Sequence, residues 1–162
     1  SRTLHRTKSG EFRLYSRNWR VQIPDDFFAG EREHLKALPK GYTVQFELYG
    51  EGINGNRLGI HGQRVYPFAA WTPSREKIDP RNIVELIGDG PQILPEEFRP
   101  VIGMRETEGY IAGNLKGFIE PGRTDEGVVY HWAGAPEYAP KWAGPNANFK
   151  ILNPAYLEEH GL

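Results

Sequence analysis

Glu47 is a carboxylate in a segment whose residue pattern predicts a β-strand. Hydrophobic and polar residues alternate along residues 43–49, which places Glu47 on the strand face opposite an apolar set. The face that carries Glu47 is either a solvated sheet surface or the wall of a cleft. In a cleft, the Glu47 carboxylate would accept hydrogen bonds from sugar hydroxyls or help to hold a cation. The apolar set consists of Val44, Phe46 and Leu48.

A second carboxylate and a lysine lie in predicted strands further along the chain. Alternation places Glu126 on the same face as Val128 and Tyr130, which are apolar. Because an unpaired buried carboxylate is costly, Glu126 lies either at an exposed strand end or beside a metal ion, a cation or hydrogen-bond donors. Lys150 lies between apolar residues of the segment 149–152. That pattern is also typical of a sheet-edge lysine whose ammonium reaches solvent.

Arg17 and a run of aromatic residues complete the set of side chains that could bind a ligand. Arg17 lies at the boundary of a predicted strand, where an ordinary surface arginine is also common. Residues 64–71 include Tyr66 and Phe68, whose rings either pack in the core or form a platform for nucleobases. The sequence contains no phosphate-binding loop of the Gly-x-x-x-x-Gly-Lys-Ser/Thr kind and no Gly-x-Ser-x-Gly elbow. Its five histidines are scattered, without the helical spacing of a metal site.

Strands and helices alternate along the chain and must position these side chains. The pattern predicts an α+β fold made of antiparallel β-sheets with flanking helices. The turn at residues 50–56 contains Asn54-Gly55, which can reach positive φ. A helix over residues 27–38 is expected, with Asp25 and Asp26 as its caps. The other predicted helices cover residues 80–87, 106–115 and 155–160, the predicted strands cover residues 11–15, 19–23, 43–49, 57–60, 63–71, 127–132 and 149–152, and a loop is predicted over residues 133–146.

Composition limits the class of protein. A length of 162 residues predicts one domain, or one domain plus a fragment of a second, and 38% hydrophobic with 25% charged residues is globular. No apolar run approaches the length of a spanning helix, and residues 1–6 do not form a signal peptide. The net charge of −1 argues against a basic wrap around a duplex but leaves a local basic groove open. The absence of cysteine rules out disulfides and thiol catalysis, and we expect a cytoplasmic protein.

Five segments, taken in order, resemble the motif series of one enzyme superfamily. Each segment alone is weakly specific, and their order and spacing carry the resemblance. The sequence is similar to the adenylyltransferase domain of ATP-dependent RNA ligases, and most similar to the branch typified by the Deinococcus RNA ligase. This domain belongs to the covalent nucleotidyltransferase superfamily, which also contains DNA ligases and mRNA capping enzymes. The segments are residues 11–18, 45–59, 64–71, 126–130 and 149–153, which are similar to the second motif, the third motif, the aromatic motif, the fourth motif and the fifth motif.

The sequence departs from the family pattern at one essential point and at two smaller ones. The family's nucleophilic lysine lies in a Lys-x-Asp-Gly motif, which is absent from residues 1–162. We expect that the chain begins just after this motif and lacks the N-terminal portion of a domain that otherwise covers residues 1–162. Lys8 has neither the position nor the Asp-Gly context of the nucleophile. Ala69 stands where many relatives have Asp, and Leu152 replaces the second lysine that the fifth motif often has.

The resemblance implies three phosphoryl-transfer steps with ATP and Mg²⁺ or Mn²⁺ as cofactors. A lysine forms a lysine–AMP adduct, AMP then moves to an RNA 5′-phosphate, and a 3′-hydroxyl displaces AMP as the strand is sealed. In this scheme Lys150 neutralises the α-phosphate, and Glu126 holds the metal ion directly or through its waters. The implied partner is RNA, with a nicked duplex as one form, and no membrane is implied.

The resemblance also implies the nucleotide contacts. Phe68, with Tyr66 as second choice, stacks on adenine, while Glu47 and Arg17 bind the ribose hydroxyls. The five residues Arg17, Glu47, Phe68, Glu126 and Lys150 are therefore expected to surround one cleft. Two alternatives stay open: a nucleotide or RNA binding module without catalysis, and a DNA ligase or capping-type transferase.

Overall fold

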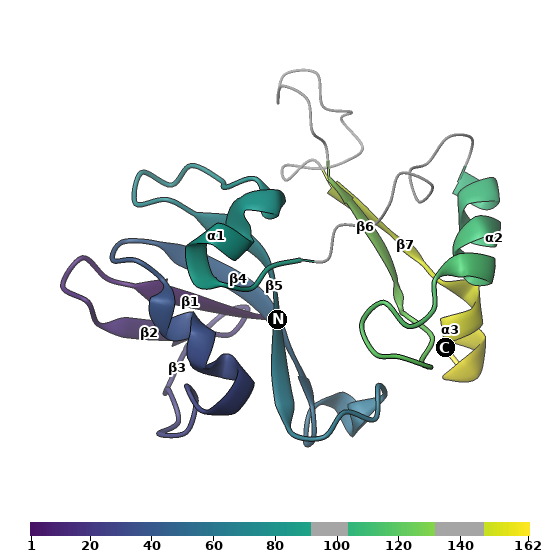
Figure 1. The fold of residues 1–162 in the computed structure, drawn as a ribbon, viewed down its shortest axis with the longest axis horizontal. Helices are drawn as coiled ribbons and strands as arrows, with labels where there is room; N and C mark the ends of the chain where they lie inside the picture. The colour runs from purple at the N-terminus through teal and green to yellow at the C-terminus, as the bar shows by residue number, and fades with distance from the viewer. Residues whose placement is uncertain (92–103, 132–147) are drawn as a thin grey trace. The chain divides into compact units, whose positions relative to one another are not determined.

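The computed structural model describes residues 1–91, 104–131 and 148–162. The chain divides into two compact units, Ser1–Ile93 and Leu94–Leu162 (Figure 1). Each unit contains antiparallel strands and helices, as expected for an α+β chain. The single domain over residues 1–162 stays a prediction. The predicted loop over residues 133–146 lies outside the described residues, as does Trp132 at the end of a predicted strand.

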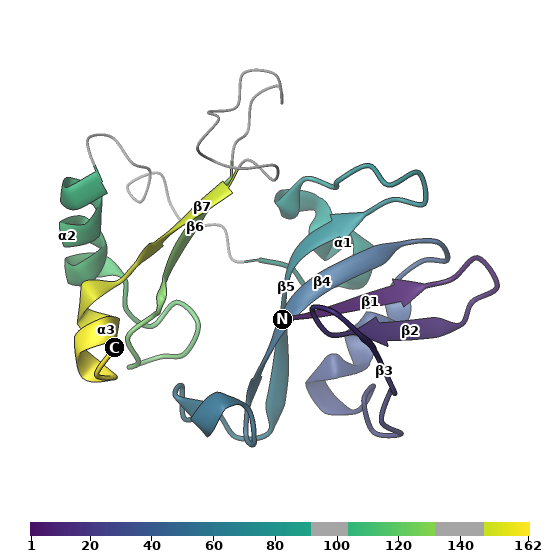
Figure 2. The ribbon, with the colours of Figure 1, turned by 180° about the vertical axis from the view of Figure 1, so that it is seen from behind.

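The first unit is built on a five-stranded antiparallel sheet with the order β3-β2-β1-β4-β5 (Figure 2). The strands predicted over residues 11–15, 43–49 and 63–71 are confirmed to within about one residue. The strand predicted over residues 19–23 forms with only two residues. The strands are β1 (Arg2–Arg6), β2 (Phe12–Tyr15), β3 (Arg20–Val21), β4 (Thr43–Gly50) and β5 (Gln63–Trp71).

The predicted helix over residues 27–38 is wrong in type and in its start. Residues Gly30–Ala37 form a 3₁₀ helix, η1, and Phe27 lies in turns that precede it. Gly30 has a φ of +58°, in the left-handed region, so a regular helix cannot run through it. The residue before η1 is Ala29, which has no side-chain cap, so Asp25 and Asp26 do not cap the helix as predicted.

The predicted strand over residues 57–60 is also wrong. The Asn56 side chain donates to the Ile60 carbonyl at 2.9 Å and accepts from the Ile60 amide at 3.0 Å. These two bonds close residues 56–60 into a loop, because they occupy the backbone groups that a strand partner would need. The preceding turn contains a short 3₁₀ segment, η2 (Asn54–Asn56), in which Asn54 and Gly55 have the positive φ that the sequence predicted.

One face of the first sheet is covered by helical segments. Val44 and Phe46 of β4 are fully buried against η1 and against α1 (Ile83–Ile87), which follows the short η3 (Pro80–Asn82). The Asp79 carboxylate accepts from the Arg81 amide at 2.9 Å, which confirms the predicted helix start. The buried residues of this core are Leu4, Leu14, Phe27, Leu35, Leu38, Val44, Phe46, Val65, Ala70, Ile83 and Ile87.

The second unit pairs two strands with two helices. Strands β6 (Gly127–His131) and β7 (Asn148–Leu152) are antiparallel, and α2 (Met104–Asn114) and α3 (Pro154–Glu159) confirm the two predicted helices to within two residues. The core of this unit contains Ile111, Leu115, Val128 and Ile151. None of the helices in the described parts of the chain is long and apolar enough to cross a membrane.

Two buried polar residues join the loop before β6 to the start of α3. Asp125 is 4% exposed, and its carboxylate accepts from the amides of Phe118 and Ile119 at 2.8 and 2.9 Å. Asn153 is fully buried, and its side-chain amide donates to the backbone carbonyls of Asp125 and Leu115 at 2.9 and 3.2 Å. The Asn153 side chain also accepts from Ala155 at the helix start. This network fixes the backbone on both sides of residue 126.

Gly127 cannot carry a side chain, and we predict that Gly127→Ala destabilises the second unit. A Cβ at this position would lie 2.2 Å from the Ile151 carbonyl oxygen and 3.0 Å from the Leu152 Cα, both backbone atoms. Separating β6 from β7 should cost roughly 1–3 kcal/mol or more. Urea unfolding followed by circular dichroism measures the change in the free energy of unfolding.

Gly113→Ala in α2 is the matched control. A Cβ there meets nothing within 4 Å, so this variant should gain roughly 0.5–1 kcal/mol from its higher helix propensity. Equal effects of the two substitutions would contradict the close approach of β6 to β7.

Candidate functional site

Glu126 and Lys150 form an ion pair on the exposed face of the two-stranded sheet. Lys150 pairs with Val129 across β6 and β7, and its ammonium lies 2.5 Å from a carboxylate oxygen of Glu126. The lysine side chain is 40% exposed and the glutamate side chain 55%. The first alternative for Glu126, an exposed strand end, is confirmed, since the residue is exposed directly before β6. Its carboxylate is also paired with a cation, the ammonium of Lys150, 24 positions along the chain.

The predicted face of Glu126 is wrong. Alternation placed Glu126 with Val128, yet Val128 is buried against Ile151 while Glu126 is exposed and reaches the opposite face, where Lys150 lies. Glu126 precedes β6, so strand alternation does not govern its side chain. The backbone carbonyl of Glu126 accepts from the backbone amide of Asn153 at 2.8 Å. This bond holds residue 126 at the end of the β6–β7 pairing rather than within it.

This pair offers the two charges that a metal-bound phosphate needs. A lysine ammonium is a compact cation for phosphate oxygens, and a carboxylate is a hard oxygen ligand for Mg²⁺ or Mn²⁺. The described residues contain no group of three or more His, Asp or Glu side chains that could hold a metal ion. Glu126 therefore fits a metal ion that keeps most of its waters and arrives with substrate phosphates, as Mg²⁺ usually does.

Glu47 lies on the exposed face of the first sheet, which agrees with the first of its two predicted positions, a solvated sheet surface. The residue is exposed on β4 and pairs with Tyr66 across β5. Its carboxylate accepts a short hydrogen bond from the Ser1 hydroxyl. An exposed carboxylate that already accepts a hydroxyl donor has the chemistry needed to accept ribose hydroxyls.

Phe68 lies at a β-bulge beside Glu47. The pairing of β4 with β5 shifts between Gln45 and Phe46, whose partners are Ala69 and Pro67, so Phe68 is left without a partner. Alternation from Tyr66 places Phe68 on the same face as Glu47, and both aromatic side chains are half-buried. Bulges commonly redirect a side chain beside a functional site. The half-buried ring is accessible enough for stacking, which a core residue would not be.

Arg17 lies in the exposed bend that joins β2 to β3. It makes no hydrogen bond or ion pair with any residue that the structure describes, so its guanidinium is available to a ligand. Arg17, Glu47 and Phe68 belong to the first unit, and Glu126 and Lys150 belong to the second. The convergence of all five on one cleft stays a prediction.

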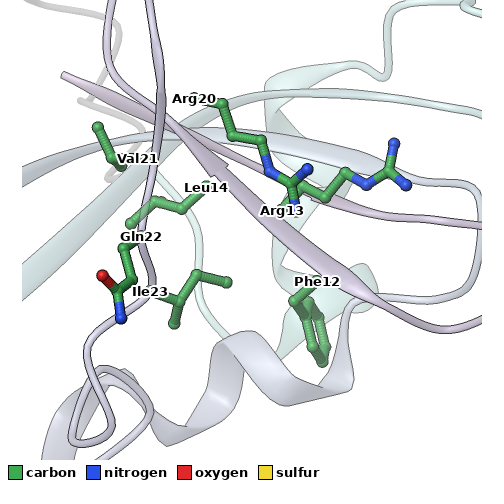
Figure 3. Close-up of a pocket in the computed structure, with 7 residues that line it drawn as sticks. All are labelled: Phe12, Arg13, Leu14, Arg20, Val21, Gln22 and Ile23. Atoms are coloured by element: carbon green, nitrogen blue, oxygen red, sulfur yellow. The ribbon is translucent and has the colours of Figure 1, made fainter.

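A shallow pocket of about 400 Å³ lies elsewhere, at the edge of the first sheet (Figure 3). Its two arginines point away from Phe12 and Ile23, and both bind the Glu11 carboxylate, at 3.0 Å for Arg13 and 2.9 Å for Arg20. The hydrogen bond from Arg13 is the main reason that the pKa of Glu11 is lowered. None of the five candidate residues lines the pocket, which is lined by Phe12, Arg13, Leu14, Arg20, Val21, Gln22 and Ile23.

Sequence reasoning missed Asp125, which lies directly before Glu126. The signal in the sequence was weak, because an aspartate in a Gly- and Arg-containing segment is typical of an exposed turn. The only hint was Asn153, which lies just before the helix predicted over residues 155–160 and whose side chain proves to bind the Asp125 carbonyl.

The fold is similar to that of solved RNA ligase structures. One is a mutant of Naegleria gruberi RNA ligase with ATP and Mn, at a TM-score of 0.68 and 20% sequence identity. Others are Naegleria gruberi RNA ligase with PPi, at 0.67 and 20%, and a different mutant with AMP and Mn, at 0.69 and 19%. Each match covers 99% of this chain. No protein family model and no curated protein matches the sequence.

The chain spans 48% of the length of these matched structures, about half. At this level of identity the likeness concerns the fold. It supports the predicted α+β fold of antiparallel sheets with flanking helices.

The environments of Asp125 and Glu126 predict different outcomes for two adjacent carboxylates. Glu126→Ala and Lys150→Ala should each lower the free energy of unfolding by less than about 1 kcal/mol, because an exposed ion pair is screened by solvent. Asp125→Ala should cost roughly 1–3 kcal/mol or more, since two part-buried amides lose their acceptor. Urea unfolding of the three variants makes the comparison, and a loss at Glu126 as large as that at Asp125 would show that the pair is structural.

Proposed function

We propose that this chain is the adenylyltransferase part of an ATP-dependent RNA ligase, in the branch typified by the Deinococcus RNA ligase. The observation that carries the proposal is the likeness in fold, over 99% of the chain, to RNA ligase structures with ATP, AMP or PPi. The five motif-like segments in family order support it independently. The RNA substrate carries a 5′-phosphate and a 3′-hydroxyl, and a nicked duplex presents both ends together.

The reaction consists of three phosphoryl transfers. A neutral lysine amine attacks the α-phosphorus of ATP, a P–N bond forms, and the bond to the pyrophosphate oxygen breaks. The RNA 5′-phosphate oxygen then displaces the lysine and takes AMP, and the 3′-hydroxyl displaces AMP as the phosphodiester forms. Catalysis of such steps is mainly positioning and charge stabilisation. Lys150 serves this purpose by remaining protonated beside the α-phosphate oxygens.

A divalent ion would supply further charge neutralisation at the phosphates when bound. Glu126 is the residue that would hold it, directly or through water. The single exposed carboxylate beside a lysine fits an ion that shares its coordination with substrate phosphates. Mg²⁺ and Mn²⁺ both have this chemistry.

The first unit would bind the nucleoside. Phe68 would stack on adenine, with Tyr66 on the same sheet face as the second candidate. The Glu47 carboxylate and the Arg17 guanidinium would bind the ribose hydroxyls as acceptor and donor.

The nucleophile would come from a lysine outside residues 1–162. None of the lysines in this sequence precedes x-Asp-Gly. A nucleotide or RNA binding module without catalysis is the alternative function. The ligase and the binding module differ in one measurable product, the covalent lysine–AMP adduct, which only the ligase forms.

Glu126→Ala should nearly abolish metal-dependent adenylylation in a protein that contains the nucleophile. The loss should be about 100-fold or more, the scale of removing one group that stabilises transition-state charge. The measurement is transfer of label from [α-³²P]ATP to protein at saturating Mg²⁺. Glu159→Ala on α3 removes an exposed carboxylate from the same unit and should leave labelling unchanged. Labelling at the wild-type rate by Glu126→Ala would remove Glu126 from the reaction.

Residues 1–162 alone should form no covalent AMP adduct. Lys150 cannot replace the nucleophile, because its assigned role requires a protonated ammonium, which has no free electron pair. The test is incubation of the 18.4 kDa chain with labelled ATP and Mg²⁺ or Mn²⁺, followed by denaturing electrophoresis. Label that stays on this chain and disappears when one particular lysine is replaced would place the nucleophile within it.

A further inference from the structure

Two turns at one end of the first sheet have the same sequence pattern and the same hydrogen bonds. Both read Thr-x-Ser-x-Glu, over residues 7–11 and 72–76. The threonine amide donates to the glutamate carbonyl at 2.8 and 2.9 Å, and the fourth residue donates back to the threonine carbonyl at 2.9 and 3.0 Å. The threonine hydroxyl accepts from the glutamate amide at 3.0 and 3.2 Å and lies 2.8 Å from the serine hydroxyl in both turns. Both turns are therefore well-defined structures.

The fourth position distinguishes the two turns. It is Gly10 in the first, with φ +100°, and Arg75 in the second, with φ +69°. Glycine adopts positive φ without strain, whereas an arginine there strains its backbone. Strained residues of this kind commonly occur where the side chain has a function. The Arg75 side chain is exposed and contributes no core packing that would account for the strain.

The segment between η1 and β4 lies against both turns. The Gly41 amide donates to the Arg6 carbonyl at 2.6 Å, and a Cβ on Gly41 would lie 2.9 Å from the Pro73 ring. The Lys40 side chain packs 3.3 Å from where a Cβ of Gly10 would be. The turns joining β1 to β2 and following β5 thus lie at the same end of the sheet, as both views show (Figures 1 and 2).

Four exposed cations are gathered at this end of the sheet, and we name them the basic turn cluster. Within the described part of the chain, none of the four makes an ion pair. Glu76 is the carboxylate nearest to them in sequence, and it accepts from the Ser74 hydroxyl. The other glutamate of the two turns, Glu11, is paired with Arg13 and Arg20, so positive charge is in excess at this end of the sheet. The cluster consists of Lys8, Lys40, Arg75 and Lys77.

We propose that the basic turn cluster binds backbone phosphates of the RNA substrate. The inference rests on the proposed function, which makes RNA the polyanion that this protein meets. Unpaired cations on short, hydrogen-bonded turns offer charge with little loss of backbone freedom on binding. The contact reads no sequence, because phosphates carry none, and it positions the strand. It also gives a role to Lys8, which lacks the Asp-Gly context of a nucleophile.

Arg75→Gly separates binding from folding. Glycine has the preferred backbone conformation at this position, so the variant should unfold at the same or a higher temperature than the wild type. Its affinity for a fluorescent nicked RNA duplex should fall, and the slope of log K against log [KCl] should become shallower by about 1. The triple variant Lys8→Gln/Lys40→Gln/Arg75→Gly should lower the slope by about 3 and the affinity at 0.1 M KCl by about 10-fold or more. Fluorescence anisotropy measures both quantities on the intact protein.

Lys116→Gln is the matched control, since it removes one exposed lysine from the second unit. It should leave the slope unchanged, and a reduction equal to that of Arg75→Gly would assign the effect to net charge and overturn the proposal. In a protein that contains the nucleophile, all cluster variants should form the lysine–AMP adduct at the wild-type rate. If that protein without substitutions forms no adduct and binds no RNA, the proposed function is overturned. A wild-type protein that does both while the triple variant binds RNA equally well would overturn the cluster alone and leave it for another polyanion, such as an acidic protein segment.

Discussion

The second unit depends on the hydrogen bonds that the buried Asp125 carboxylate accepts from backbone amides. This carboxylate is almost fully buried, pairs with no cation in the described parts of the chain, and accepts hydrogen bonds from the amides of Phe118 and Ile119. Buried ionised groups persist only when their hydrogen-bonding capacity is satisfied. Asn153 completes the arrangement by binding the Asp125 carbonyl, so the loop before β6 and the start of α3 are held together. The next residue, Glu126, is thereby fixed at the end of the ladder with its carboxylate in solvent.

Two adjacent carboxylates in this chain thus have opposite surroundings, one buried and one exposed. Asp125 is locked by backbone donors and is not available to a ligand. Among the described residues, Glu126 pairs with Lys150, and because both side chains are exposed, solvent weakens the attraction between them. In the first unit the division is by sheet face: the core takes Val44 and Phe46, and the opposite face carries Glu47 and the bulged Phe68.

The long strands could be predicted from the sequence because one buried face imposes a period of two, as along residues 43–49 and 63–71. The helix over residues 27–38 was wrong because its periodicity ignored Gly30, whose φ is set by the local turn. The strand over residues 57–60 failed since an Asn56 side chain took the backbone groups of Ile60. Alternation also misplaced Glu126, which lies outside the strand that was used to orient it. The candidate site residues could be chosen from the order of the motifs. The bulge at Phe68 and the partner of Glu126 could not be predicted, because both depend on pairing between segments far apart in the sequence, which no local pattern contains.

The two Thr-x-Ser-x-Glu turns differ at one position, and that difference decides what each turn can touch. Gly10 leaves a flat backbone surface, so the aliphatic stem of Lys40 can lie across it at a distance that a methyl group would crowd. At the corresponding position of the second turn, Arg75 presents an exposed side chain, and Gly41 lies instead against the Pro73 ring of that turn. The same hydrogen-bonded turn therefore receives a lysine side chain at its fourth position in the first copy and exposes an arginine there in the second. The side chain that this end of the sheet presents can accordingly change through a single residue, while every hydrogen bond of the turn is kept.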